Sequence, residues 1–375
     1  MWCAEQAVRR SASQPATRRH VLLRIPTLSF PERLAQRLVR AMRVVDFHAS
    51  ASDQSLFDFQ PNAARARIIE ARVRAGLVDS IEAALRAVSG YGAPSGDTLL
   101  ARIRAGPVSP VVFGAYTDLV EAIFADDIDG AVTIANELCA PGFGLDPGLR
   151  VVTLEDSALG EGQAARYCRL IDDDPILLAQ LRALSPDAFA AAAARVKQAI
   201  ALLDAAAPEI AGELRALVRE IVLVDQPGDT HFGASSFQIW GALFLRPCRH
   251  GGRVVIAEAL AHEAAHALLF GFGMGKALVV NEADELYASP IRDDLRPMDG
   301  IVHATYVLAR MHYVGMHLLA SGLLTQEEQQ IAREEQARHR HYYTKGIAVA
   351  ETHAKWTKAG EAALNSAKAY MNAVR

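Results

Sequence analysis

The residues best suited to chemistry are two histidines and a glutamate with the spacing HExxH. His262 and His266 lie four residues apart, and Glu263 directly follows the first histidine. In a helix, positions i and i+4 lie on one face, so both imidazoles can bind the same metal ion. The residues immediately around the motif are uncharged, which predicts a buried helix. The pattern therefore indicates a metal centre, with Glu263 beside the bound ion.

A protein-bound metal ion needs a further protein ligand, and several downstream residues qualify. His303 lies near the start of the next predicted helix. Asp294 would complete the set of two histidines and one carboxylate that binds non-haem iron. Glu282 or Glu285 would instead complete the ligand set of a zinc peptidase. The residues alone leave these alternatives open, as they leave open the choice between iron and zinc.

The elements that position this motif are two short strands and two helices. Glu220–Asp225 and Ser236–Arg246 are rich in branched or aromatic residues and are predicted strands. A Gly-Gly turn then leads into a predicted helix over 253–270, which carries HExxH, and a second helix is predicted over 300–320. The predicted fold class is α+β and predominantly helical, with a small antiparallel strand pair next to the HExxH helix.

The rest of the chain is also predicted to be mostly helical. Helical periodicity or alanine-rich sequence covers 29–88, 114–139, 173–219 and 325–373, with loops over 89–110 and 271–298 and a short strand over 151–154. We expect a basic flexible tail over 1–28, a helical region over 29–204 and a catalytic region over 205–375. The last two regions are expected to form one continuous globular unit.

Composition excludes several classes of protein. Of the 375 residues, 51% are apolar and 22% are charged, which excludes a disordered scaffold or a collagen-like rod. The net charge of −4 gives no overall attraction for nucleic acid. No apolar run reaches the roughly 20 residues of a membrane span, and the basic N-terminus lacks the apolar core of a signal peptide. The four cysteines form no CxxC pair. We therefore expect a cytoplasmic protein without a nucleic-acid or membrane partner.

A second motif follows the HExxH helix. Tyr287–Tyr306 fits the pattern Y-x-S-P-x-R-x-D-x-R-P-x-x-G-x-x-H-A-x-Y. Together with HExxH it resembles the HExxH-type peptide β-hydroxylase family, the peptide-modification proteins of ribosomal natural-product gene clusters. The two motifs cover about residues 254–312. Ile291 stands where the family usually has tryptophan, and Leu295 stands where proline is common. Both departures exchange one apolar residue for another and affect pocket shape more than chemistry.

The resemblance implies a dioxygenase that uses Fe(II), 2-oxoglutarate and O₂ to hydroxylate a side-chain β-carbon of a ribosomally made precursor peptide. It implies His303 as the third metal ligand, because the family motif carries this histidine. The distal carboxylate of 2-oxoglutarate needs a cation, and the planar fork of arginine binds carboxylates through two hydrogen bonds. The candidates are Arg296, Arg292 and Arg310. In this chemistry Glu263 orients a ligand or the substrate.

Substrate contacts are expected near the strand that precedes the metal-binding helix. An exposed edge strand can bind an extended peptide, and Ser235 and Ser236 lie at its entrance. Tyr287 is a third candidate. Two other functions compete with hydroxylation. A zinc metallopeptidase would use Glu263 as its general base, and a non-catalytic precursor-binding protein would keep the metal-binding helix without its chemistry.

Overall fold

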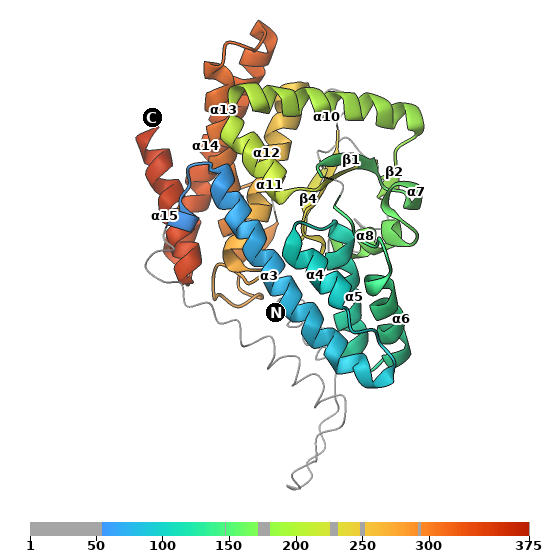
Figure 1. Ribbon diagram of the computed structural model, residues 1–375. Coiled ribbons are helices and arrows are strands. Elements are labelled where there is room, and N and C mark those ends of the chain that lie inside the picture. Colours follow the sequence, from blue (N-terminus) through green and yellow to red (C-terminus); the bar gives the residue numbers. More distant parts are fainter. Residues whose placement is uncertain are drawn as a thin grey trace, which may run out of the picture. The chain divides into compact units, whose positions relative to one another are not determined.

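The computed structural model describes residues 55–146, 148–171, 181–225, 232–247, 252–291 and 294–374 (Figure 1). The predicted tail over 1–28 and Arg292 lie outside the described residues. The described chain is predominantly helical, with a small mixed sheet and short antiparallel strand pairs. The predicted α+β fold class is therefore confirmed.

The chain divides into two compact units. Among the described residues, the first unit is Ala71–Asp146, and the second unit comprises 55–70 and 148–374. Helix α3 (Ala63–Val88) contributes to both. The predicted division between residues 204 and 205 falls inside α10 (Pro186–Ala206), so the residues on both sides of it belong to the second unit.

The first unit is built from helices. After α3 come η2 (Ser89–Tyr91), α4 (Asp97–Ala105), α5 (Pro110–Phe124) and α6 (Ile128–Cys139). The helix predicted over 114–139 is broken between α5 and α6. There Asp126 has a φ of 59°, and the Asp127 side chain caps α6 by accepting from the backbone N–H of Gly130. The loop predicted over 89–110 is wrong in part, because it contains α4.

The second unit contains a small mixed sheet. Its strands are β1 (Arg150–Thr153), β2 (Arg182–Ala183), β3 (Glu220–Asp225), β4 (Phe232–Ser235) and β5 (Ala242–Arg246). The order is β1-β3-β5-β4. The strands β1 and β5 run parallel to β3, β4 is antiparallel to β5, and β2 pairs with β3 in the antiparallel sense. The strand predicted over 220–225 is confirmed by β3.

The strand predicted over 236–246 is two elements. Ser236 caps a short 3₁₀ turn, η3 (Phe237–Ile239), by accepting from the backbone N–H of Gln238. Gly241, with a φ of 93°, then redirects the chain into β5. The antiparallel partner of β5 is β4, which the sequence analysis did not predict. The strand pair next to the HExxH helix is thus β4–β5, and β4 is one edge of the sheet as described.

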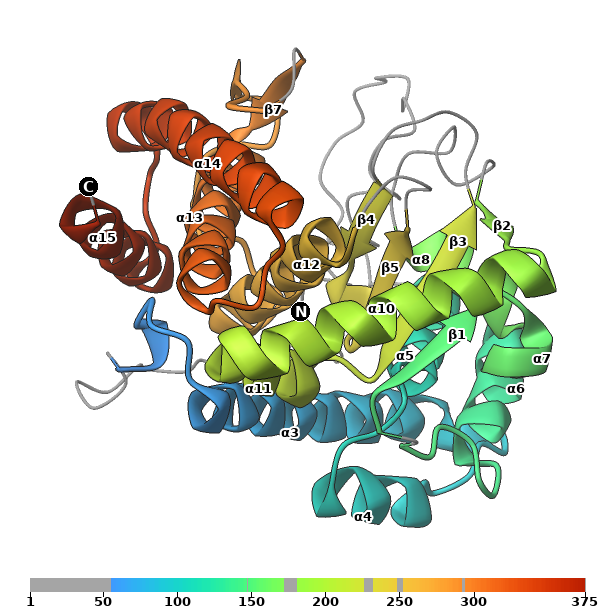
Figure 2. The same ribbon diagram turned by 90° about the horizontal axis from the view of Figure 1, so that it is seen from above.

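Helices cover the sheet and build the rest of the second unit. They are α7 (Asp156–Leu159), α8 (Gln163–Ile171), α10, α11 (Pro208–Leu217), α12 (Arg253–Gly273), α13 (Met298–Ala320), α14 (Gln326–His353) and α15 (Lys358–Ala373). Helix α10 packs against α12 and against β3, and α13 packs closely along α14 (Figures 1 and 2). A Cβ on Gly346 of α14 would come within 2.3 Å of the Thr305 hydroxyl of α13. Glycine at this position therefore allows the two helices to approach.

The segment between α12 and α13 contains a two-stranded ribbon and is tied to the C-terminal part of the chain. The loop predicted over 271–298 includes β6 (Leu286–Ala288) and β7 (Leu295–Pro297). Before the ribbon, the carbonyl of Leu278 accepts hydrogen bonds from the backbone N–H and the hydroxyl of Thr357 at 3.2 and 2.8 Å. The backbone N–H of Val280 donates to the carbonyl of Lys355 at 2.7 Å. Residues 355–357 therefore act as a clamp on the segment that leads into β6.

Helix α12 is the most apolar of the long helices. Among the described residues it is the one helix whose length and hydropathy would suit a membrane span, and 72% of that stretch is buried inside the protein. A core helix passes the same test, so this is weak evidence for a span. In this fold α12 contacts β4, β5, α10, α13 and α14. It therefore occupies the centre of the second unit.

Helix α14 begins with a capping box that also binds α12. Thr325 accepts from the backbone N–H of Glu328, and the Glu328 carboxylate accepts from the backbone N–H of Thr325 at 2.9 Å. The same carboxylate receives two hydrogen bonds from Arg253, at 2.8 and 3.0 Å. These contacts, Arg253 foremost, lower the pKa of Glu328 to about 2.

We predict that Glu328→Ala lowers the free energy of unfolding by about 1 kcal/mol at pH 7, as expected for loss of a helix cap. The folded-state pKa is depressed, so this contribution is present above about pH 4.5 and is lost as the pH falls toward 2. Urea unfolding at pH 7 and pH 3 measures the difference. Glu327→Ala, at an exposed neighbouring carboxylate, is the matched control. An equal loss for both variants would contradict the role of Glu328.

Candidate metal centre

The three predicted metal-binding histidines lie in contact with one another. His262 and His266 come from one face of α12, and their Nε2 atoms are 3.2 Å apart. His303 comes from the second turn of α13, and its Nδ1 atom is 3.2 Å from Nδ1 of His266. The three rings therefore form a chain in the order 262, 266, 303, with His266 in the middle.

The pair of Nε2 atoms has the spacing of two ligands on one ion. Bonds of about 2.0–2.1 Å to a tetrahedral metal place two nitrogens about 3.3 Å apart. On the opposite side of His262, Nδ1 lies 3.1 Å from the thioether sulfur of Met311. Sulfur in a thioether is only an acceptor, so this nitrogen carries the proton and Nε2 carries the lone pair. The His262 ring is thus held in the tautomer that ligates through Nε2.

The surroundings of both histidines in the motif favour the neutral imidazole over the charged form. Burial lowers the pKa of His262, and burial together with the two neighbouring histidines lowers the pKa of His266 well below its usual value. Neutral imidazole is the form that binds metals. The His262 side chain nevertheless keeps 29% of its surface exposed, which leaves an approach for an ion or a substrate.

His303 lies on the other side of His266 from His262. Because His266 faces its two neighbours with different ring nitrogens, an ion held between the Nε2 atoms reaches His303 only after one ring turns. His303 lies between His266 and Asp299, whose Oδ2 is 3.9 Å from the Nε2 atom of His303. Asp299 is itself held by the backbone N–H of Leu278 at 3.1 Å. A histidine in this position also orients the ligand beside it.

Glu263 lies beside the histidine pair, as the motif predicts. Its Oε1 is 3.7 Å from the Nε2 atom of His262, and its Oε2 accepts a hydrogen bond from the Ser235 hydroxyl at 2.9 Å. Burial raises the pKa of Glu263 to about 8, and the Ser235 hydrogen bond partly opposes this. A divalent cation nearby would favour the carboxylate again. Ser235, predicted to contact substrate, therefore contacts Glu263, and its contact with substrate stays a prediction.

Two residues that approach the site were missed by sequence reasoning. Gly233 of β4 leaves the space that the Glu263 carboxylate occupies, since a Cβ at that position would lie 2.4 Å from Oε1. Met311 follows His303 by eight residues, which places both on one face of α13. This spacing could have identified Met311. No local sequence pattern identifies Gly233 as a site residue, because Glu263, the residue that it approaches, lies 30 positions later.

Arg310 was expected near 2-oxoglutarate, and its contacts contradict that role. The side chain is buried, and its guanidinium donates to the Glu213 carboxylate of α11 and to the carbonyl of Phe59. Arg65 of α3 donates to the same carboxylate at 2.8 Å. Glu213 thus lies between two arginines, and the charge of Arg310 is already paired. Arg310 directly precedes Met311, which contacts His262, and adjacent residues of a helix point to different sides.

The candidates in the Tyr287–Tyr306 motif gather on the β6–β7 ribbon. Tyr287 pairs with Arg296 across the two strands. Arg296 forms an ion pair with Asp294 at 2.6 Å, while 40% of its side chain stays exposed. Its Nε is buried without a hydrogen-bond partner. Arg296 therefore keeps donor capacity for an anion, whereas Asp294 is directed to Arg296 and not to the histidines.

The two glutamates that a zinc peptidase would use are not at the histidines. Glu285 accepts from Lys355 at 2.8 Å and from the amide of Asn281 and the hydroxyl of Tyr287, each at 3.0 Å. Lys355 is the largest cause of the lowered pKa of Glu285, which falls to about 2. Glu282 is exposed. Tyr287, expected to bind substrate, is likewise engaged in this cluster, and Ser236 caps η3.

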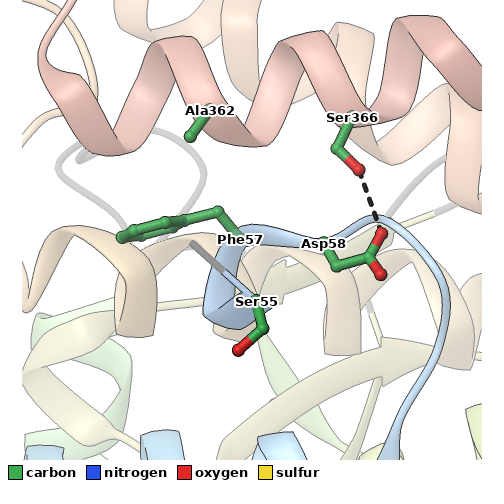
Figure 3. A pocket seen from close by; sticks show the side chains of 5 residues that line it. All are labelled: Ser55, Phe57, Asp58, Ala362 and Ser366. Atoms are coloured by element: carbon green, nitrogen blue, oxygen red, sulfur yellow. Dashed lines mark hydrogen bonds between the residues drawn. The ribbon is translucent and has the colours of Figure 1, made fainter. Parts of the chain in front are cut away.

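A surface pocket of about 360 Å³ lies elsewhere in the second unit. Its lining residues are Ser55, Phe57, Asp58, Ala362 and Ser366 (Figure 3). The Ser366 hydroxyl donates to Asp58 at 3.1 Å and accepts from the backbone N–H of Phe59 at 2.7 Å. These polar groups are used to attach α15 to the start of the described chain. None of the residues in the histidine chain lines this pocket.

We predict that Gly233→Ala destabilises the protein by about 1–3 kcal/mol, because the new methyl group overlaps the Glu263 carboxylate. In a Glu263→Ala background the same substitution should cost little, since the overlapping atoms are gone. Urea unfolding of the four chains of this double-mutant cycle measures the coupling.

Gly300→Ala provides the matched control, because its methyl group would meet only Arg296 Cβ at an ordinary 3.9 Å. Equal costs of Gly233→Ala in both backgrounds would show that Glu263 does not approach β4.

The site thus combines a histidine pair with ligand spacing, a third histidine in contact, and a buried carboxyl group held by Ser235. This arrangement can bind a divalent metal ion and present a carboxylate beside it. Comparison with known proteins adds no relative: no protein-family model matches the chain, and no curated protein sequence matches it.

Proposed function

We propose that this protein is an Fe(II)- and 2-oxoglutarate-dependent dioxygenase that hydroxylates a side-chain β-carbon of a ribosomally made precursor peptide. The proposal joins the resemblance of the HExxH and Tyr287–Tyr306 motifs to the histidine chain. Its metal ligands are His262, His266 and His303. Because ribosomal peptides are made in the cytoplasm, we propose that the enzyme acts there.

The observation that carries the proposal is the contact between His303 and His266. The resemblance requires a histidine at position 303 near the HExxH pair, and these two residues are 37 positions apart in sequence. A zinc peptidase would instead bring Glu282 or Glu285 to the pair. Glu285 is held by Lys355, and Glu282 is exposed. The position of these side chains favours a three-histidine centre.

The donor set suits the cofactors that the proposal requires. Imidazole ligands suit Fe(II), which with 2-oxoglutarate and O₂ would supply the oxidising power for C–H hydroxylation. Arg296 is the remaining described candidate for the distal carboxylate of 2-oxoglutarate, because its guanidinium is partly exposed and its Nε has no partner. Glu263, fixed by Ser235, orients the substrate or a ligand beside the metal.

The peptide substrate would bind along β4. Among the described residues β4 pairs only with β5, so its other edge presents backbone donors and acceptors. An extended peptide added to this edge would gain main-chain hydrogen bonds. Ser235 ends this strand and touches Glu263, which brings such a peptide next to the metal.

One observation keeps the zinc peptidase as the second candidate. Glu263 is buried within 3.7 Å of the metal-binding nitrogen of His262, where a general base beside a metal-bound water would also lie. The two candidates make different demands on His303, Arg296 and the choice of metal, so binding measurements separate them.

We predict that His303→Ala weakens Fe(II) binding by more than 100-fold, comparably to His262→Ala and His266→Ala. A residue that only orients His266 would cost about 10–100-fold. Anaerobic titration with a competing chelator measures the affinity. His341→Ala, at an exposed histidine of α14, should leave it unchanged. A loss of less than about 100-fold in His303→Ala would remove His303 from the ligand set.

We also predict a weak visible charge-transfer band when 2-oxoglutarate is added to the anaerobic Fe(II) protein. The band should be absent in His262→Ala and should need at least tenfold more 2-oxoglutarate in Arg296→Ala, because the latter loses the cation for the distal carboxylate. Arg333→Ala, at an exposed arginine of α14, is the control. Absence of the band, together with zinc-dependent cleavage of a peptide that requires Glu263, would replace the dioxygenase with the peptidase.

A further inference from the structure

A second group of potential metal ligands lies one helical turn before the HExxH motif. Glu258 precedes His262 by four residues, so it lies on the same face of α12. Glu335 and His339 lie four residues apart on one face of α14, which packs against α12. One donor atom from each of these three residues lies within 4.8 Å of the others. The group is thus formed by residues about 80 positions apart in sequence.

Two polar atoms in this group are buried and have no hydrogen-bond partner. They are Oε1 of Glu258 and Nδ1 of His339. Glu258 is 2% exposed and His339 is 3% exposed. An unsatisfied buried polar group costs about 1–3 kcal/mol, and more when it is charged. Burial and the nearby Glu335 carboxylate raise the pKa of Glu258 well above its ordinary value. This arrangement is costly unless something binds to it.

The spacing of His339 and Glu335 fits two ligands of one ion better than hydrogen-bond partners. Nε2 of His339 lies 3.7 Å from Oε2 of Glu335, which is too long for a hydrogen bond. Ligands bonded to a common ion at about 2.0–2.2 Å lie roughly 3–4 Å apart. Gly315 of α13 closes the third side, since a Cβ there would approach Oε1 of Glu258 to 3.7 Å. The carboxylate therefore lies where α12, α13 and α14 meet.

The chemistry of the donors points to a divalent transition metal. Two carboxylates and one imidazole suit Mn²⁺, Fe²⁺ or Zn²⁺. A dication would balance the two carboxylate charges and make the buried group neutral. Arg338 also pairs with Glu335, but 56% of its side chain is exposed. Solvent weakens the effect of that charge on the buried Glu258.

We propose that Glu258, Glu335 and His339 form a second divalent-metal site, which joins α12 to α14 independently of the HExxH centre. The two sites share one face of α12 and lie about 6 Å apart along its axis. The ion holds α14 to the helix that carries His262 and His266. The site uses none of the proposed ligands of the catalytic metal, and it stands whether or not the protein is a dioxygenase.

Metal stoichiometry of the full-length chain tests the proposal. After loading with Mn²⁺ or Zn²⁺ and desalting, the wild type should retain two ions per chain. The Glu258→Gln/His339→Gln variant should retain one, and His262→Ala/His266→Ala should also retain one. Glu334→Gln removes an exposed carboxylate next to Glu335 and should leave two. One ion in the wild type that is lost only with His262 and His266 would overturn the second site.

Thermal unfolding provides a readout that does not depend on the HExxH centre. In the His262→Ala/His266→Ala chain, added Zn²⁺ should still raise the melting temperature, because binding to the folded state stabilises it. The rise should disappear when Glu258→Gln and His339→Gln are added. Without metal, the chain with these two further substitutions should melt close to its parent, because Glu258→Gln keeps the size of the side chain and leaves it uncharged. This comparison checks that the variant folds. A metal-induced rise that survives them would contradict the proposal.

Discussion

The burial of ionisable side chains on α12 is the constraint on which the rest of the second unit depends. The helix is otherwise apolar and lies at the centre of that unit, where an unpartnered ionisable group is expensive. Its polar residues therefore need partners from other elements. Strand β4 supplies Ser235, α13 supplies His303 and Met311, and α14 approaches Glu258 with His339. The arrangement of these elements therefore places partner side chains beside the HExxH motif.

A second buried network secures α13 so that His303 can meet His266. Glu213 of α11 receives hydrogen bonds from Arg65 of α3 and Arg310 of α13, and all three residues are buried. Removing one member would leave a charge uncompensated in the core, which is strongly destabilising. Within this network the charge of Arg310 is already paired with Glu213. The ion pair between Arg310 and Glu213 holds α13 in position, and α13 carries His303 two turns earlier.

Local patterns predicted the parts of the fold that depend on nearby residues. The HExxH helix and β3 follow from periodicity and composition over a few residues. Strand β4 was missed because Phe-Gly-Ala-Ser has weak strand propensity and forms through its pairing with β5. The pairing of Arg310 with Glu213, and the approach of α14 to Glu258, join residues roughly 80–100 positions apart. No local pattern reports such contacts.

The clamp formed by residues 355–357 has a consequence for the order in which the protein is made. The Leu278 and Val280 backbone groups that lead into the β6–β7 ribbon find their partners only in residues synthesised some 75 positions later. Synthesis proceeds at about 5–20 residues per second. For several seconds, a growing chain would carry its HExxH helix while the ribbon with Tyr287 and Arg296 still lacks its anchor. The ribbon can thus take its final position only after residues 355–357 have been synthesised.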